Sequence, residues 1–234
     1  MNLRAARAAA FSEMSAGYRV GFALVTSSGQ TLASVNQNAQ NYGASITKSM
    51  LLVAFLEDHA TQGLDSESIQ ELTAMIEVSD NEAADWVYAH LSSPSREVED
   101  VASAAGMTGF RLDLSDPVYV LGQSLVTAHG FAQFFANIQS MMPARYRKFG
   151  MNLLGHVEQR VGLLAAGLPG TVFSKEGWKP EGSGLLGAPY VVNQAAQFSC
   201  RGVRYGIAVT VGHAEDETSA EAVVQRIASS LMNY

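Results

Sequence analysis

A serine and a lysine stand three positions apart in the stretch YGASITKSM, at Ser45 and Lys48, directly before the apolar run LLVAFLEDHA. Residues at this spacing share a helix face, and a helix start adds free backbone N–H groups and the positive end of the dipole. A partly desolvated amine there can lose its proton and act as base for the hydroxyl, which becomes a nucleophile without histidine. The structural alternative makes Ser45 an N-cap and Lys48 a solvated first-turn residue, and the S-x-x-K spacing alone does not separate the two.

Two further polar motifs follow in the chain. Ser79–Asn81 is S-D-N and stands between two predicted helices, and Lys175–Gly177 is K-E-G at the end of a predicted strand. Each has a structural alternative: Ser79 with Glu82 fits a capping box, and lysine and glutamate are ordinary on an edge strand. The order of the motifs and their spacing, 34 positions (45 to 79) and 96 positions (79 to 175), favour chemistry over coincidence.

The ordered trio S-x-x-K, S-D-N and K-[TS]-G is the signature of penicillin-binding proteins and class A β-lactamases. The chain resembles this serine-hydrolase superfamily over nearly its whole length. The resemblance implies an α/β (α+β) fold of the β-lactamase/transpeptidase type, with an antiparallel sheet, flanking terminal helices and an inserted all-helical lobe. It also implies acylation of a serine by a β-lactam, a D-alanyl peptide or a related amide, followed by hydrolysis, with no cofactor.

The resemblance assigns a role to each matching residue. Ser45 would be the acylated nucleophile and Lys48 its base. Ser79 would carry the proton towards the leaving nitrogen, while Asn81 would hold the substrate amide and contact Lys48. Lys175 would sit across the cleft, hold Ser79 and add a positive field.

The strand motif both completes the site and departs from the family. The backbone N–H groups of Ser45 and Trp178 would form the oxyanion hole, and Gly177 and Glu176 would lie against the substrate. Glu176 stands where the family has threonine or serine, and a carboxylate facing the cleft would repel a substrate carboxylate. Strand alternation would instead place Lys175 and Glu176 on opposite faces, so the direction of Glu176 stays open.

A second departure concerns deacylation. Class A enzymes carry a glutamate in an E-x-x-L-N loop, and no such stretch occurs between Asn81 and Thr127. Asp113 and Asp116 are the carboxylates in the equivalent segment, although an aspartate before Pro117 is more typical of a turn. We therefore expect a slow or absent hydrolytic step, that is, a weak or atypical β-lactamase.

Two alternatives to that function stay open. One is an acyltransferase or esterase that keeps Ser45 and Lys48 but acts on a substrate without a carboxylate, and the other is a degenerate, non-catalytic binding module. Arg201 and Arg204 are candidate cations for a substrate carboxylate. Fold alone does not choose among these, because activity depends on the site.

Composition excludes several kinds of binding partner for this chain. The net charge of −7 and the absence of a basic face argue against nucleic acid, and no run of eighteen apolar residues predicts a membrane span. The five histidines show no metal-ligand spacing and the single Cys200 is expected to be a buried, inert thiol. We expect a monomer, without a metal, that acts on a small molecule or peptide.

The pattern of elements predicts how the motifs are positioned. Residues 18–37 form a hairpin pattern around SSGQ, and strand patterns return in 171–175, 190–198 and 203–212. Helix patterns cover the N-terminus, six segments between 45 and 167, and Thr218–Met232 with a T-x-x-E start. We expect one two-lobed domain over 1–234, with a sheet lobe (about 1–44 and 170–234) and a helical lobe (about 45–169). The N-terminus does not resemble a signal peptide, and the resemblance favours an extracytoplasmic location if a signal has been removed.

Overall fold

The computed structural model describes residues 1–115, 121–158, 161–181 and 189–232. Its first half contains α1 (Leu3–Ser15), β1 (Arg19–Thr26), β2 (Thr31–Val35), β3 (Gln40–Tyr42), a 3₁₀ turn η1 (Ala44–Thr47), α2 (Lys48–Asp58), α3 (Ser66–Glu77), α4 (Asn81–Ala89) and α5 (Pro94–Ala104). Its second half contains β4 (Leu125–Thr127), α6 (Ala128–Met141), α7 (Arg147–Gly155), β5 (Phe173–Pro180), β6 (Tyr190–Cys200), β7 (Val203–Ala214) and α8 (Glu217–Met232).

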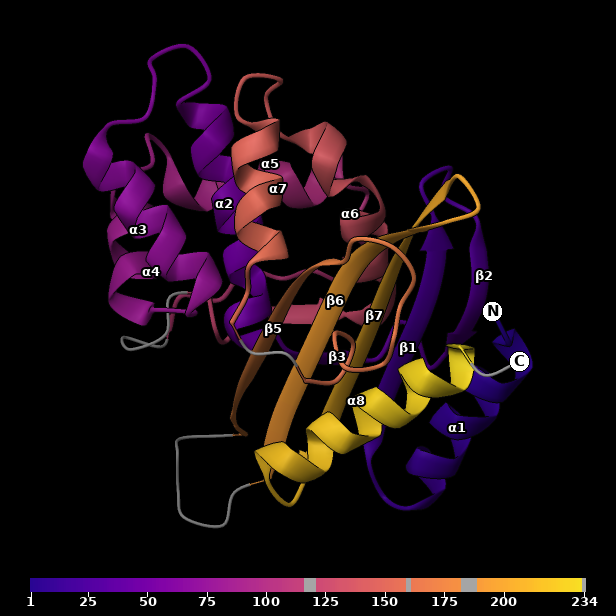
Figure 1. Ribbon diagram of the computed structural model, residues 1–234. Helices are drawn as coiled ribbons and strands as arrows, with labels where there is room; N and C mark the ends of the chain where they lie inside the picture. The colour runs from indigo at the N-terminus through magenta and orange to yellow at the C-terminus, as the bar shows by residue number, and fades with distance from the viewer. Residues whose placement is uncertain (116–120, 159–160, 182–188, 233–234) are drawn as a thin grey trace.

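Both ends of the chain build one antiparallel sheet. Its five strands run in the order β2-β1-β7-β6-β5, and β1 pairs with β7 along its whole length (Figure 1). The predicted hairpin at 18–37 and the three later strands are confirmed. Because β5 lies at the edge, its K-E-G motif pairs with β6 on one side only and lies against the η1 turn at Gly177.

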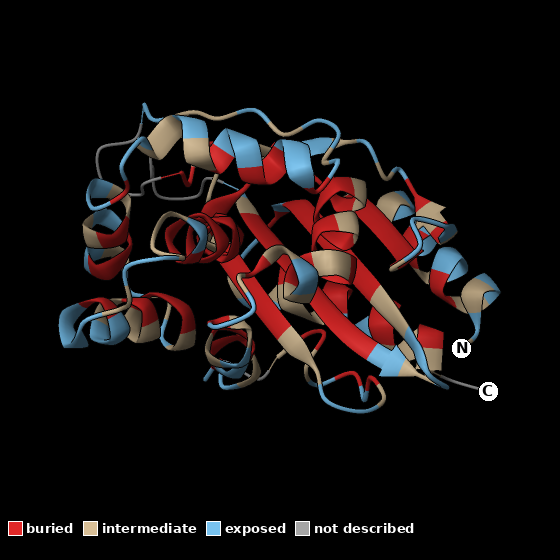
Figure 2. Cartoon of the chain, turned by 90° about the horizontal axis from the view of Figure 1, so that it is seen from above, coloured by how far each residue is buried: buried red, intermediate tan, exposed pale blue. Residues whose placement is uncertain are grey.

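Two apolar layers hold the sheet. On one face α1 and α8 pack on side chains such as Phe22 and Val209, and on the other face α6 and α2 pack on Ala23 and Ala208. Buried residues run along the strands and the central helices in Figure 2. Helix α2 is buried from Lys48 to Leu56, so it crosses the interior and holds its first turn rigidly.

Two local predictions differ from the structure. The helix expected over 146–167 ends at Gly155, and Leu163 instead donates its backbone N–H to Gln194 Oε1 in a turn that Gly162 enters at φ +54°. The expected box at Thr218 is absent, because Asp216 caps α8 by accepting from Ser219 N. Asp216 and Thr218 are both side chains that favour the N-cap, and sequence spacing does not decide which of them takes it.

The N-terminal helix is confirmed as α1, whose Ala6 and Ala10 face the sheet. Within the described residues, no helix is both long and apolar enough to cross a membrane. The division into a sheet lobe and a helical lobe with the stated boundaries stays a prediction. One helix of the central segment, α6, packs directly on β7, since Gly206 leaves room for the α6 backbone at Ala132.

Candidate functional site

Ser45 lies in the 3₁₀ turn η1, directly before α2, rather than on the α-helix itself. The preceding residue, Ala44, has φ +49°, a conformation that costs a non-glycine residue energy and needs support from its surroundings. Hydrogen bonds supply that support: Gly43 N donates to Ser124 O over 2.7 Å, and Ala44 N donates to Gly122 O over 3.0 Å. The structural alternative for Ser45 is wrong, because Thr47 occupies the N-cap of α2 and no side chain bonds there.

A buried asparagine fixes the chain on the other side of this turn. Asn193 on β6 is fully buried and its Nδ2 donates to Tyr42 O over 2.6 Å and to Gly43 O over 3.1 Å. Strand β3 ends at Tyr42 and pairs with β4, so the segment before Ser45 is held from two directions. These short strands and Asn193 carry no recognisable signal in the sequence.

Lys48 is buried, with 3% of its surface exposed, which removes the alternative of a solvated first-turn residue. Its Nζ donates to Asn81 Oδ1 over 2.6 Å and to the backbone carbonyl of Ser79. Burial, followed by the nearby Lys175 ammonium, lowers the pKa of Lys48 to about 7. The carboxylates of Asp80, Asp85 and Glu176 act in the opposite direction. A large fraction of this amine is therefore neutral near pH 7 and able to accept a proton.

The S-D-N motif brings its serine and asparagine to Lys48. Asp80 caps α4 by accepting from Ala83 N over 2.8 Å, so the capping box expected from Ser79 and Glu82 is wrong. Ser79 directly precedes this cap and has φ +61°, in the left-handed region. Its Oγ accepts a hydrogen bond of 2.9 Å from Lys175 Nζ. Asp80 therefore caps the helix, and the Ser79 hydroxyl is available to bond Lys175 instead.

Lys175 reaches the same cluster from the edge strand. Its side chain is fully buried, and burial lowers its pKa while the Glu176 carboxylate acts to raise it. Nζ also donates to Glu176 O over 3.0 Å and lies 3.4 Å from Glu176 Oε1. The structure thus gathers Lys48, Ser79, Asn81 and Lys175 around one point, in agreement with their predicted proximity.

Glu176 does not point away from this cluster. The side chain is 6% exposed and lines a cavity together with Ser79 and Trp178, so of the two directions left open by the sequence it takes the one towards the cleft. A carboxylate consequently stands in the cleft at the position where the family has a hydroxyl.

The edge strand also touches the turn that carries Ser45. A Cβ atom added to Gly177 would lie 2.5 Å from Ser45 N and would also collide with Ile46 N. The backbone of β5 and the N–H of Ser45 are therefore adjacent, and Trp178 follows in the strand. This is the arrangement that an oxyanion hole formed by Ser45 N and Trp178 N requires.

Replacing Gly177 with alanine is expected to slow labelling of Ser45 by a neutral fluorophosphonate about 100-fold, because a shift of about 1 Å in an acyl-transfer site costs about that factor. The clashing atoms belong to backbone and have no flexible side chain to yield. The rate of adduct formation by intact mass measures the effect. Gly155→Ala is the matched control, since its new methyl would meet Phe173 at an ordinary 3.5 Å. Equal labelling of both variants would contradict the close approach.

Two cavities adjoin at Trp178. The one at Ser45 is lined by Ala44, Ser45, Lys48, Asn81, Gly122, Trp178 and Lys179 and has a volume of about 10 Å³, which is room for about one water. The second, of about 400 Å³, is lined by Glu77, Val78, Ser79, Glu158, Glu176 and Trp178. The site is narrow at the serine and wide beyond Ser79.

Sequence reasoning missed six of the described residues in these walls, of which Lys179, Gly122, Glu77 and Glu158 are the most informative. Lys179 lies at the serine, and its Nζ stands 5.5 Å from the ring centre of Tyr42. Its spacing of four from Lys175 on one strand could have placed both on the same face. Gly122, Glu77 and Glu158 enter through loops and helix ends, for which periodicity gives no signal.

Other predicted residues lie elsewhere or outside the description. Asp113 is partly exposed, and hydrogen bonds from Ser115 lower its pKa. It is not among the residues that line the cavity at Ser45. Asp116 lies outside the described residues. Arg201 is exposed in the β6–β7 turn and Arg204 donates to Gln139, beside another cavity, so the suggestion that they bind a substrate carboxylate is wrong.

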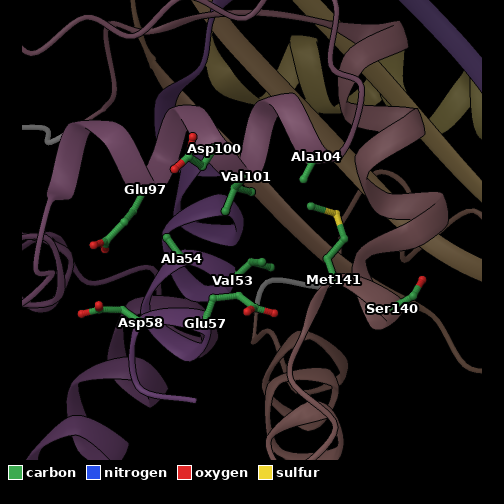
Figure 3. Close-up of a pocket in the computed structure, with 10 residues that line it drawn as sticks. All are labelled: Val53, Ala54, Glu57, Asp58, Glu97, Asp100, Val101, Ala104, Ser140 and Met141. Carbon is green, nitrogen blue, oxygen red and sulfur yellow. The ribbon is translucent and has the colours of Figure 1, made fainter. Parts of the chain in front are cut away.

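A separate cavity of about 620 Å³ lies among α2, α5 and α6. Figure 3 shows its apolar side chains, such as Val53, Val101 and Met141, with the carboxylates of Glu97 and Asp58 to one side. None of its lining residues belongs to the three motifs. The predicted chemistry therefore lies at the narrow cavity and not here.

Comparisons with known proteins agree with the geometry. The sequence profile of the Beta-lactamase enzyme family matches residues 66–234, a range that includes S-D-N and K-E-G but not Ser45 or Lys48. No curated protein sequence matches the chain.

Solved structures show the same fold. A β-lactamase from Sphaerobacter thermophilus has a TM-score of 0.78 at 17% identity and covers 99% of this chain and 97% of its own. A β-lactamase from Desulfarculus baarsii gives 0.77 at 20% identity, with the same coverage. The L158E mutant of PBP-A, solved as an acyl-enzyme complex with penicillin G, gives 0.76 at 16% identity and covers 97% of this chain and 94% of its own. The predicted fold class is confirmed.

Proposed function

Because the chain belongs to the Beta-lactamase enzyme family, we propose that it is a serine hydrolase that forms an acyl-enzyme on Ser45. The observation that supports this most strongly is the neutral-prone Lys48, whose pKa is about 7 and which is held beside Ser79 and Asn81 directly after the Ser45 turn. A buried amine with a pKa of about 7, directly after the turn that carries a serine, has the properties of a general base for that serine.

The reaction follows from this geometry. Lys48 takes the hydroxyl proton as Ser45 Oγ forms a bond to the substrate carbonyl, and the developing oxyanion lies between Ser45 N and Trp178 N. The bond to the leaving atom then breaks, and the proton reaches that atom through Ser79, whose Oγ is oriented by Lys175. No hydrogen bond joins Ser45 Oγ to Lys48 Nζ in the described residues, so the pair is completed by a rotation of either side chain when substrate binds.

The second half of the reaction has no assigned base. The described residues that line the cavity at Ser45 include no carboxylate. Water activation would need a group that the loop beyond Asn81 does not bring there in the described residues. We therefore propose that deacylation is slow, as in a weak or atypical β-lactamase.

Glu176 favours a second candidate function. Its carboxylate lines the cleft beside Ser79, where the carboxylate of a penicillin or a D-alanyl peptide would be repelled. An esterase or acyltransferase that acts on substrates without a carboxylate would not meet this repulsion. This candidate uses the same Ser45, Lys48 and Ser79.

One experiment separates these functions. Intact protein is incubated with benzylpenicillin, a chromogenic cephalosporin and a neutral fluorophosphonate, with Ser45→Ala as control. A stable penicillin adduct on the wild type alone supports slow deacylation, and ring-opened product without an adduct means that water is activated. Labelling by the fluorophosphonate alone supports the second candidate. No adduct and no product with any reagent would refute a serine hydrolase and leave a binding module.

A further inference from the structure

The wide cavity beyond Ser79 has an acidic wall. Of the six described residues that line it, three are glutamates, Glu77, Glu158 and Glu176, and none is lysine, arginine or histidine. They come from the end of α3, the segment after α7 and the edge strand β5. Folding therefore brings together three carboxylates that are far apart in the sequence, at the entrance to the candidate active site.

The negative charges of two of these carboxylates, Glu77 and Glu176, have few favourable partners among the described residues. Glu77 is the last residue of α3, where the negative end of the helix dipole disfavours an anion. Glu176 is 4% exposed, and its one ion-pair contact is Oε1 to Lys175 Nζ at 3.4 Å. Its Oε2 accepts no hydrogen bond from a described residue. Because Oε2 is also not one of the described buried atoms without a partner, it is open to the cavity and can accept a hydrogen bond from a bound group.

The nearby lysine does not neutralise this wall. Lys175 is fully buried, and its Nζ donates to Ser79 Oγ and lies 3.4 Å from Glu176 Oε1, so it is directed at these two groups and not at Glu77 or Glu158. Three carboxylates thus face about 400 Å³ of space against one shielded amine. The cavity is large enough for a small cationic head group and unfavourable for an anion.

A substrate on Ser45 has to extend into this space. The cavity at the serine holds about one water, and the wide cavity shares Trp178 with it and has Ser79 in its wall. Ser79 delivers the proton to the leaving atom in the proposed reaction, so the group beyond Ser79 is the leaving group. We propose that the leaving group of the substrate carries a positive charge, such as an ammonium, which Glu77, Glu158 and Glu176 bind. This inference rests on the proposed function of Ser45.

Three thioesters with one common acyl group test the proposal. Their thiols are thiocholine, which is cationic, 3,3-dimethylbutane-1-thiol, its neutral isostere, and 3-mercaptopropionate, which is anionic. Ser45 Oγ forms the new C–O bond, the C–S bond breaks and the hydroxyl proton leaves with the thiol. The rate of release of the first equivalent of thiol is measured, because it needs acylation but no deacylation.

We expect the thiocholine ester to react about tenfold faster than its neutral isostere, since each partly exposed charge pair is worth up to a few-fold. The anionic ester should be slower than both. The advantage should shrink as salt is raised from 50 to 500 mM, because ions screen exposed charges. In the double variant Glu77→Gln/Glu158→Gln the ratio of cationic to neutral ester should fall towards one. Glu99→Gln, an exposed change on α5, should leave the ratio as in the wild type.

The outcomes distinguish this inference from the function on which it rests. If a neutral fluorophosphonate labels Ser45 but the cationic ester shows no advantage, the inference is wrong and the serine hydrolase stands. The same holds if the double variant keeps the full ratio. If Ser45 is not labelled by the fluorophosphonate and no thiol is released, the proposed function fails and the inference falls with it.

Discussion

Replacing Lys48 with methionine is expected to slow acylation of Ser45 by about three orders of magnitude, the usual contribution of a general base. Methionine keeps much of the length and apolar volume of the buried side chain, so the loss should come from the missing amine. Lys48→Arg should be equally inactive, because a guanidinium stays protonated at every accessible pH. The rate of fluorophosphonate adduct formation by intact mass measures both. Lys148→Met, an exposed lysine on α7, is the control and should react as the wild type.

The same amine sets the expected pH dependence. The pKa of Lys48 is lowered to about 7, and only its neutral form accepts a proton. Acylation should therefore rise about tenfold between pH 6 and pH 8 and then level off, since the neutral fraction follows the titration of one group. A normal lysine would instead place the rise above pH 9. A flat profile between pH 6 and pH 8 in the wild type would contradict the role of Lys48.

Replacing Glu176 with threonine, which restores the K-T-G form of the strand motif, is expected to speed acylation by benzylpenicillin about 100-fold. Two carboxylates about 5 Å apart at an effective dielectric constant of about 20 repel each other by about 3 kcal/mol. The change removes that repulsion and adds a hydroxyl beside Ser79. The second-order rate of penicillin adduct formation measures the gain.

Glu176→Gln separates the two parts of this effect, since it removes the charge without adding the short hydroxyl. It should recover most of the gain if repulsion dominates. Labelling by a neutral fluorophosphonate serves as the internal reference, because that reagent carries no carboxylate. The loss of the carboxylate also lets the pKa of Lys175 fall further, as Glu176 acts to raise it. If penicillin reacts no faster with either variant, Glu176 does not restrict carboxylate substrates.

Much of the fold could be predicted from sequence patterns. The hairpin at 18–37, the three later strands and most helices follow from apolar periodicity, which depends on local geometry and is legible in one segment at a time. It also located the motifs, because Ser45, Lys48, Ser79 and Lys175 have residue types and an order that packing alone does not require. Helix boundaries were predicted less well. Helix α7 ends at Gly155, and the turn after it is held by the hydrogen bond from Leu163 N to Gln194 Oε1.

The charges and pKa values of the site depend on contacts that exist only in the folded chain. Alternation along β5 left the direction of Glu176 open, and in the fold Lys175 donates to Ser79 while Glu176 lines the same cavity as Ser79. The pKa of Lys48 depends on burial and on Lys175, which is 127 positions away (48 to 175). The acidic cavity likewise joins Glu77, Glu158 and Glu176 from three elements. Spacing in a sequence specifies which groups are available, whereas desolvation and Coulomb interaction depend on distances that only the folded chain defines.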